Sequence, residues 1–357
     1  MKASKKHMHR QRTTKSSEAP QNWKKWKFEK KTLREDWNNF DTQKHGGNSV
    51  STADNVEKKV RNYTMSIAVP GSILDNAQSR ELRTYLVGQI ARAATIFNVD
   101  EIVVFDDTGS LSSQDEIEED IMKQNSSCSS MARILQYLEC PQYLRKCFFD
   151  LHRDLSYAGL LNPLDTPHHL RKDEDFQFRD GVVLEKQKSG KGSYVNVGLG
   201  HDDILIDKVL QPGLRVTVEV LSSGGKKRKG RVIDPQILRS KYGIYWGYNV
   251  RLAESLGAVF KRCPYEGGYD VTIGTSDKGV PLNEVQLSEF RHLIVVFGGL
   301  KGLEMSLECD KNLPENDPRD IFTFYVNSCV NQGTRTIRTE EAILITLASL
   351  QPNLDKS

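Results

Sequence analysis

The stretch TMSIAVPGSILDNAQSRELRTYLVGQIARAATIFNVDEIVVFDD, residues 64–107, decides the fold class. Its two ends, TMSIAV at 64–69 and EIVVFDD at 101–107, are short and almost continuously apolar, which is typical of strands buried on both faces of a sheet. Between them, Ser79 is suited to cap a helix. Apolar side chains then recur at helical spacing, at Leu82, Leu86, Ile90, Ala93 and Phe97. Strand–helix–strand of this kind predicts an α/β domain with a parallel sheet.

The pattern changes at residues 177–258. Six short alternating segments follow one another there, separated by Gly, Pro and Asp turns, and they predict a small β-barrel of the OB type. After residue 259 the α/β pattern returns with YDVTIG, LIVVFGG and IFTFYVN, and a helix is expected from Thr339 to Leu350. We therefore expect the barrel to be an insertion that divides one α/β domain into residues 63–176 and 259–357.

Charge separates along the chain although the formal net charge is only +3. Residues 1–62, a polar and mostly disordered tail by composition, carry 16 Lys and Arg against 7 Asp and Glu. Residues 177–258 carry 14 against 8, and the rest of the chain carries 20 against 32. Clustered cations release counterions from phosphate backbones, so a nucleic acid is the expected partner, although a solvated tail and a chance cluster remain the alternative.

Several classes of protein are disfavoured. No apolar run reaches the roughly 20 residues that span a membrane, and no secretory signal is expected. The six cysteines form no CxxC pair, which indicates reduced thiols in an intracellular protein and no zinc site. His168 and His169 lack patterned partners for a metal, so an RNA-contacting loop or the hinge into the barrel is the better interpretation.

Three predicted strands end in polar, glycine-containing loops: IGTSDKG at 273–279, FGGLKG at 297–302 and NSCVNQGTRTIRTEEA at 327–342. Ligands of parallel sheets bind beyond the carboxyl ends of the strands, where glycine lets the backbone approach them closely. None of these loops matches a phosphate-binding GxxxxGK[ST] motif, and no GxGxxG follows the first strand. The sequence therefore predicts a ligand site of another kind at this edge.

A resemblance to a known family rests on the strings PGSILDNAQSRELRTYLVGQIARA, AGLLNPLDTPHH, GYDVTIGTS, VVFGGLKGLE and QGTRTIRTEEAILI. They resemble the centromere protein 32 group of eukaryotic SPOUT-domain RNA methyltransferases, which is the class IV, trefoil-knot family. The resemblance covers about residues 63–352. It implies a trefoil-knotted SPOUT domain of α/β class with an inserted OB-like barrel, S-adenosylmethionine as cofactor, a homodimer and RNA as substrate. It also implies a nuclear, nucleolar and cytoplasmic protein that acts at spindle poles, centrosomes and kinetochores in mitosis.

Carried onto this chain, the family's cofactor loops imply a set of cofactor-binding residues from the three glycine-containing loops. They are Gly274, Thr275, Ser276, Phe297, Gly298, Gly299, Asn327, Gly333, Thr334, Arg335, Thr336 and Ile337. Glu340 and Glu341 lie in the first turn of the expected last helix, where a carboxylate suits the helix dipole, so we assign them no catalytic role.

The methylated atom is open at this point. Attack at C5 of a pyrimidine needs a cysteine adduct, and Cys329 is the candidate, although a small buried thiol without a nearby base is the better interpretation. We favour a base nitrogen such as N3 of uridine, with a ribose 2′-oxygen as second choice. Positive charge would stabilise the uridine anion, and the expected catalytic residues are Arg335, Arg338 and Arg83. Arg83 would act from the partner subunit, with an exposed helix arginine as an equal alternative.

RNA is expected to contact the barrel hairpin and the first α/β loop. The expected contact residues are Lys226, Lys227, Arg228, Lys229, Asn76 and Arg83, with Tyr194, Tyr245, Trp246 and Tyr248 as possible stacking platforms. For Trp246, a place in the core of the barrel or of an interface is an alternative at least as well supported. The main rival function is a catalytically inactive SPOUT fold that serves as an RNA-binding or spindle-associated scaffold.

Overall fold

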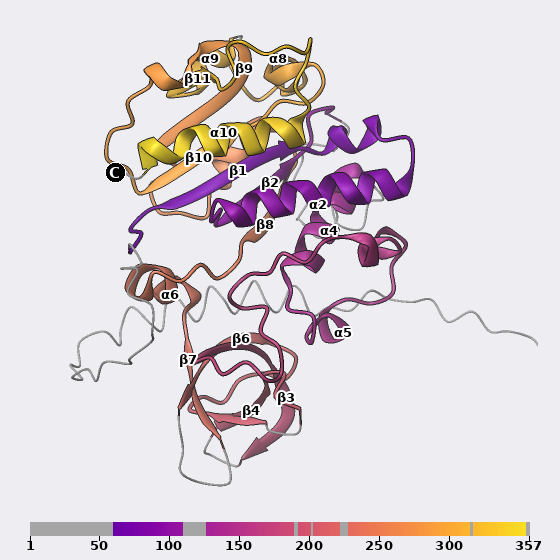
Figure 1. Ribbon diagram of the computed structural model, residues 1–357, viewed down its shortest axis with the longest axis vertical. Coiled ribbons are helices and arrows are strands. Elements are labelled where there is room, and N and C mark those ends of the chain that lie inside the picture. The colour runs from indigo at the N-terminus through magenta and orange to yellow at the C-terminus, as the bar shows by residue number, and fades with distance from the viewer. Residues whose placement is uncertain are drawn as a thin grey trace, which may run out of the picture. The chain divides into compact units, whose positions relative to one another are not determined.

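The computed structural model describes residues 60–109, 126–188, 192–200, 203–221, 228–314 and 317–354 (Figure 1). The basic tail up to residue 59 and the cations Lys226 and Lys227 lie outside these ranges. Within the described part of the chain, no helix is both long and apolar enough to cross a membrane.

A six-stranded sheet forms the centre of the α/β domain, with strand order β11-β9-β10-β1-β2-β8 and parallel pairing throughout. Its strands are β1 (Thr64–Pro70), β2 (Glu101–Phe105), β8 (Asn249–Ala253), β9 (Val271–Pro281), β10 (His292–Val296) and β11 (Phe324–Asn327). Every residue of β1 and β2 is buried. This agrees with their continuous apolar sequences, because helices cover both faces of a parallel sheet.

Helices lie on both faces of this sheet. On one face, a core that includes Ile67 and Val104 packs against α2 (Arg80–Ile96), α4 (Ser127–Glu139) and α10 (Thr339–Leu354). On the other face, Ala68 and Val103 pack against α7 (Leu256–Lys261), α8 (Gly302–Cys309) and α9 (Pro318–Ile321). Figure 1 shows α2 and α10 side by side, and the two helices are in contact.

Side chains cap the first turns of two helices, at Ser79 as expected from the sequence and also at Ser126. The Ser79 side chain accepts from the Leu82 N–H at the start of α2, and Ser126 forms a capping box with Ser129 at the start of α4. The remaining helices are short: η1 (Gly71–Asn76), α5 (Arg145–Phe148), η2 (Arg153–Leu155), η3 (Ala158–Leu160), α6 (Pro235–Tyr242) and η4 (Leu282–Glu284).

The insertion contains a closed five-stranded barrel of order β3-β4-β5-β7-β6. Its strands are β3 (Phe178–Lys188), β4 (Gly192–Asn196), β5 (Ile204–Ile206), β6 (Arg215–Leu221) and β7 (Lys229–Ile233). β3 pairs with β6, and β5 runs parallel to β7, so the sheet closes on itself. Inward-facing residues such as Val195, Ile204 and Val218 fill its core.

The sixth segment expected in the barrel, NVRLA, belongs instead to the parallel sheet. As β8 it pairs with β2 from Glu101↔Asn249 to Phe105↔Ala253. β8 is the last strand in the order, so its alternating pattern is that of an edge strand with a partly exposed start. Alternation alone does not distinguish such a strand from a barrel strand. The last barrel strand is β7, which ends at Ile233 and not near residue 258.

Candidate functional site

A cavity of about 590 Å³ lies where the carboxyl ends of β9, β10 and β11 meet the start of α10. Its volume is typical of small-molecule sites. The lining comes from residues 275–278, from the loops after β10 and β11, and from η1, α10 and the first turn of α8. Residues 273–279 do not form the loop expected from the sequence, because β9 continues through them to Pro281. The site is thus at the edge of the sheet where parallel α/β proteins bind ligands.

Most of the expected cofactor residues meet at this cavity. Nine of them line it: Thr275, Ser276, Phe297, Gly298, Gly299, Asn327, Arg335, Thr336 and Ile337. Gly274, Gly333 and Thr334 are not among the described residues that line it. A Cβ on Gly274 would lie 2.5 Å from the Phe322 ring, so this glycine permits close packing of the opposite helix layer.

The loop after β10 is held in a tight turn. The Gly302 N–H donates to the Gly299 carbonyl at 3.0 Å, and Gly302 has a φ of 77°, which favours glycine. A Cβ on Gly298 would lie 2.7 Å from the Gly302 backbone. From the start of α10, the Thr339 hydroxyl donates to the Gly298 carbonyl at 2.9 Å. These contacts present backbone groups to the cavity in a fixed arrangement.

The loop after β11 is organised by Asn327. Its side-chain nitrogen donates to the Asp277 carbonyl at 2.8 Å, and its side-chain oxygen accepts from the Cys329 N–H at 2.9 Å. The amide therefore joins the polar part of β9 to the loop after β11 and shapes the cavity wall. Cys329 lines the same wall.

Sequence reasoning missed polar groups at the same edge. Just after β2, the Asp107 carboxylate accepts from the Ser72 hydroxyl at 2.5 Å. A Cβ on Gly299 would lie 3.0 Å from this carboxylate. Burial raises the pKa of Asp107, while the Ser72 hydrogen bond opposes the shift. Lys278 and Glu304 form an ion pair of 2.8 Å on the cavity lining. In the sequence, two consecutive aspartates at the end of a predicted strand could have indicated Asp107. No local pattern indicates that Lys278 and Glu304 are partners, because they lie in different elements.

The expected catalytic arginines divide into two groups. Arg335 and Arg338 are exposed and line the cavity, as does Asn76 at the end of η1. Arg83 is not among the described lining residues; its Nε donates to the Ala77 carbonyl at 3.3 Å, and its guanidinium lies 3.9 Å from Asp75. Within one chain, the structure brings Arg335, Arg338 and Asn76 together and leaves Arg83 outside.

The possible stacking residues also divide. Trp246 is only 9% exposed and donates to Asp180, and Tyr248 is buried and donates to the Leu135 carbonyl, so stacking on RNA is the wrong interpretation for both. Tyr245 donates to the Val99 carbonyl beside the parallel sheet. Tyr194 alone of the four is on a barrel strand, partly exposed, with the Lys186 ammonium 4.7 Å from its ring centroid.

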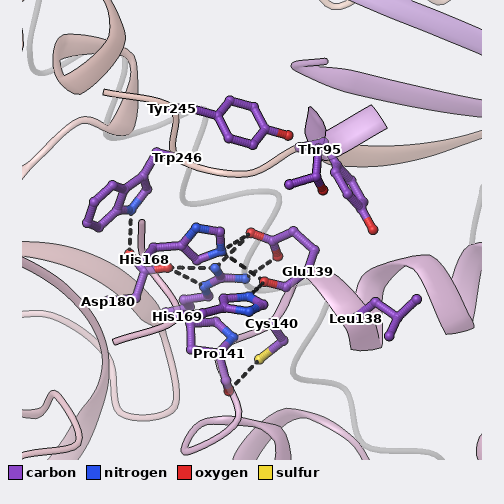
Figure 2. Close-up of polar contacts among 12 residues, drawn as sticks. Thr95, Leu138, Glu139, Cys140, Pro141, His168, His169, Asp180, Tyr245 and Trp246 are labelled. Atoms are coloured by element: carbon purple, nitrogen blue, oxygen red, sulfur yellow. Dashed lines mark hydrogen bonds and ion pairs between the residues drawn. The ribbon is translucent and has the colours of Figure 1, made fainter. Parts of the chain in front are cut away.

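The two adjacent histidines lie at the entry to the barrel, where the sequence offered a hinge as one interpretation. His168 is fully buried, and both rings contact the Glu139 carbonyl oxygen, at 2.9 Å and 2.7 Å (Figure 2). Among the described residues, no group of three or more His, Cys, Asp or Glu side chains is arranged to hold a metal ion.

Glu341 accepts from the Arg338 N–H at 3.1 Å, which is a helix-capping contact.

Comparisons with known proteins show the family of this chain. Residues 64–350 match the family described as "Putative RNA methyltransferase". A mouse protein called 28S rRNA (uridine-N(3))-methyltransferase is 58% identical over 299 residues, which is 82% of this chain and 77% of the relative. A human protein of the same name is 56% identical over 303 residues, or 84% and 80% of the two chains. The Drosophila melanogaster protein of that name is 53% identical over 303 residues, or 82% and 62%. The chain therefore belongs to this RNA methyltransferase family.

Proposed function

We propose that the chain transfers a methyl group from S-adenosylmethionine to N3 of a uridine in large-subunit ribosomal RNA. The observation that carries this proposal is the cavity at the strand ends, which two exposed arginines line beside backbone groups held in a tight turn. The names of the relatives supply the substrate: the mouse, human and fly proteins are all described as uridine-N3 methyltransferases of 28S rRNA.

The residues at the cavity suit a nucleoside-bearing cofactor. Leu300 and Ile337 offer apolar surface for an adenine, and the hydroxyls and loop backbone offer polar partners for a ribose and an amino acid. The Phe297 side chain is only 1% exposed, so this residue contributes mainly its backbone to the cavity. Sites for small molecules combine apolar walls with a few fixed polar groups in this way. S-Adenosylmethionine, when bound, supplies an electrophilic methyl group on a sulfonium.

Uridine N3 needs a free lone pair before it can accept that methyl group. Loss of the N3 proton to solvent would free this lone pair, and the bound cofactor would supply the methyl group and leave as S-adenosylhomocysteine. Arg335 and Arg338 stabilise the negative charge that the base acquires, because a cation beside a developing anion lowers the barrier. The Gly298–Gly302 turn and the Asn327 amide orient the cofactor against the base.

Three further proposals accompany this function. The α/β domain is a trefoil-knotted SPOUT domain, with the contact between Thr339 and Gly298 tying the last helix to the β10 loop. The barrel is of the OB type, supported by its closed five-stranded order. The protein acts as a homodimer in the nucleolus, where ribosomal RNA is made. The spindle, centrosome and kinetochore role stays a prediction from the family resemblance.

The test is mass spectrometry of nucleosides from ribosomal RNA of cells with and without the protein, combined with methylation of the same RNA by purified protein. Loss of N3-methyluridine at one site, restored by the purified enzyme with S-adenosylmethionine, is the expected result. Loss of a ribose 2′-O-methyl group would replace uridine N3 as the acceptor. An unchanged set of methylated nucleosides would favour the inactive scaffold.

A further inference from the structure

One buried guanidinium joins the barrel to the α/β domain. Arg215 on β6 donates to both carboxylate oxygens of Glu139, the last residue of α4, at 2.6 and 2.9 Å. The same side chain donates to the Asp180 carboxylate on β3 at 2.6 and 3.0 Å. The three side chains are 14% exposed or less. We name this group, Glu139, Asp180 and Arg215, the joint.

Both connections between the two domains attach to the joint. On the way into the barrel, His168 Nε2 contacts the Glu139 carbonyl oxygen at 2.9 Å and its carboxylate at 3.2 Å. Because both of these atoms only accept, Nε2 must carry the proton. On the way out, the Trp246 indole donates to Asp180 at 2.9 Å, as Figure 2 shows. A Cβ at Gly247 would lie 2.6 Å from the Glu139 carboxylate.

The return segment has a second attachment at the amino ends of the sheet strands. Arg239 of α6 donates to Asp100 at 2.7 Å, and the Tyr245 hydroxyl donates to the Val99 carbonyl at 2.8 Å. Asp100 also accepts from the Met65 N–H at the start of β1 at 2.8 Å. The barrel is therefore attached to the end of α4 and, through α6, to the end of the sheet opposite the cavity.

Charge is a costly way to hold two domains together. Well-packed apolar side chains often stabilise as much as a buried ion pair, because burial removes the water that solvated the charges. Burial alone would raise the pKa of Glu139, but Arg215 and His168 hold that pKa well below its usual range. The charged joint also fixes the orientation of the elements that carry it. A bidentate guanidinium–carboxylate pair sets the angle between the two groups as well as their distance.

We propose that Arg215 is a positioning residue for methyl transfer. It holds the barrel in one orientation, so that RNA bound to the barrel presents its target base to the cavity where Arg335 and Arg338 lie. This proposal rests on the proposed function in requiring methyl transfer to RNA, whichever atom accepts the group, and on the expected binding of RNA to the barrel. Geometric control of this kind acts on turnover more than on binding, because each binding surface is intact.

The experiment compares Arg215→Lys with wild type in the full chain. Lysine keeps the buried positive charge but loses the planar fork that joins two carboxylates. We expect turnover, counted as labelled methyl groups transferred per cofactor-binding molecule, to fall at least tenfold. The Kd values for RNA and for S-adenosylmethionine should change less than threefold. The matched control is Arg231→Lys, which alters an Arg–Glu pair within the barrel and should leave turnover unchanged.

A second measurement does not depend on activity. Bio-orthogonal spin labels at Leu151 and Val209, both exposed, report the distance between the α/β domain and the barrel. Arg215→Lys should broaden this distance distribution, and Glu139→Gln is a second, isosteric variant should the first fail to fold. Unchanged turnover in a folded variant would overturn the proposal, as would an RNA Kd that rises in proportion to the loss of turnover. Methylation of another atom would refute uridine N3 and leave this test valid.

Discussion

At the scale of single residues, Gly299 is the sharpest probe of the cofactor cavity. A Cβ there would lie 3.0 Å from an Asp107 oxygen and 3.2 Å from the Ser72 hydroxyl. A larger side chain would therefore press against these two groups and displace the loop after β10. We expect Gly299→Val to remove measurable S-adenosylmethionine binding in calorimetry while the protein stays folded.

Two further glycines make this test specific. A Cβ at Gly333 meets nothing within 4 Å, so a weaker binding of cofactor by Gly333→Ala would indicate that the cofactor itself touches this residue. Gly159→Ala, also in open space, is the control for an effect of substitution alone. Unchanged affinity in folded Gly299→Val would place the cofactor elsewhere.

The two cavity arginines should act on turnover. Arg335→Ala and Arg338→Ala each remove a positive charge from beside the uridine anion, which costs on the order of 2–4 kcal/mol of transition-state stabilisation. Single-turnover rates should therefore fall by roughly 30-fold to 1,000-fold, while the cofactor Kd stays within threefold. Equal losses in rate and cofactor affinity would instead make these arginines cofactor-binding residues.

His169 should make the stability of the protein depend on pH. Burial and the neighbouring His168 lower its pKa to about 4, below the value of about 6.5 in an unfolded chain. Because the unfolded chain then binds the proton more readily, the free energy of unfolding falls as the pH drops from about 6.5 towards 4, by up to about 2 kcal/mol at pH 5. Above pH 6.5 this group has no effect.

Thermal unfolding measured from pH 8 to pH 5 checks this expectation. His169→Gln keeps an N–H donor for the Glu139 carbonyl but cannot titrate, so its Tm should fall less on acidification than that of wild type. Parallel pH profiles for the two proteins would show that His169 is already as accessible to protons as in the unfolded chain.

At the scale of elements, the hairpin between β6 and β7 carries the RNA prediction. Lys229 is exposed at the start of β7, where it pairs with Leu205, and Leu205 in turn pairs with Tyr194 on β4. Changing Lys226, Lys227, Arg228 and Lys229 to serine should weaken RNA binding and flatten its salt dependence. The slope of log K against log salt should change by up to about 2.8, or about 0.7 for each phosphate contact.

Cofactor affinity should stay unchanged in that variant, because the cavity is built from elements outside the barrel. The control variant is Lys261→Ser with Lys311→Ser, which removes exposed cations from the α/β domain. RNA affinity is measured at several salt concentrations for all three proteins. Coincident slopes for wild type and the hairpin variant would show that RNA enters by another surface.

At the scale of the whole molecule, α2 and α10 present the surface expected for a homodimer. Tyr85, Ile96 and Leu344 are each about half exposed around a shallow hollow between the two helices, although α10 buries its opposite face in the core. Apolar side chains gathered in this way often mark an interface. We expect light scattering to give twice the 40.5 kDa mass of the chain, with two-fold symmetry.

Leu344→Asp should dissociate this dimer, because it places a charge in the apolar surface. Leu151→Asp, at a fully exposed position elsewhere, is the control and should remain dimeric. A wild-type mass of 40.5 kDa at micromolar concentration would contradict the expectation.

The sequence by itself determined what depends on neighbours along the chain. The strands β1 and β2, helix α2 with its Ser79 cap, and the loops after β10 and β11 could be predicted because their periodicity and turn residues lie within a few positions of one another. The loop expected at 273–279 is part of β9 instead. The parallel sheet then placed those loops at one edge, so most of the cofactor candidates line one cavity.

Only the tertiary structure decided the contacts between residues far apart in the chain. Glu139 and Arg215 are 76 positions apart, and Asp180 and Trp246 are 66 apart, so nothing local marks them as partners. The same holds for β8, which alternates like a barrel strand but pairs with β2, 148 positions away at Glu101↔Asn249. The physical reason is that burial and pairing of such residues depend on which elements pack together, a property of the folded chain.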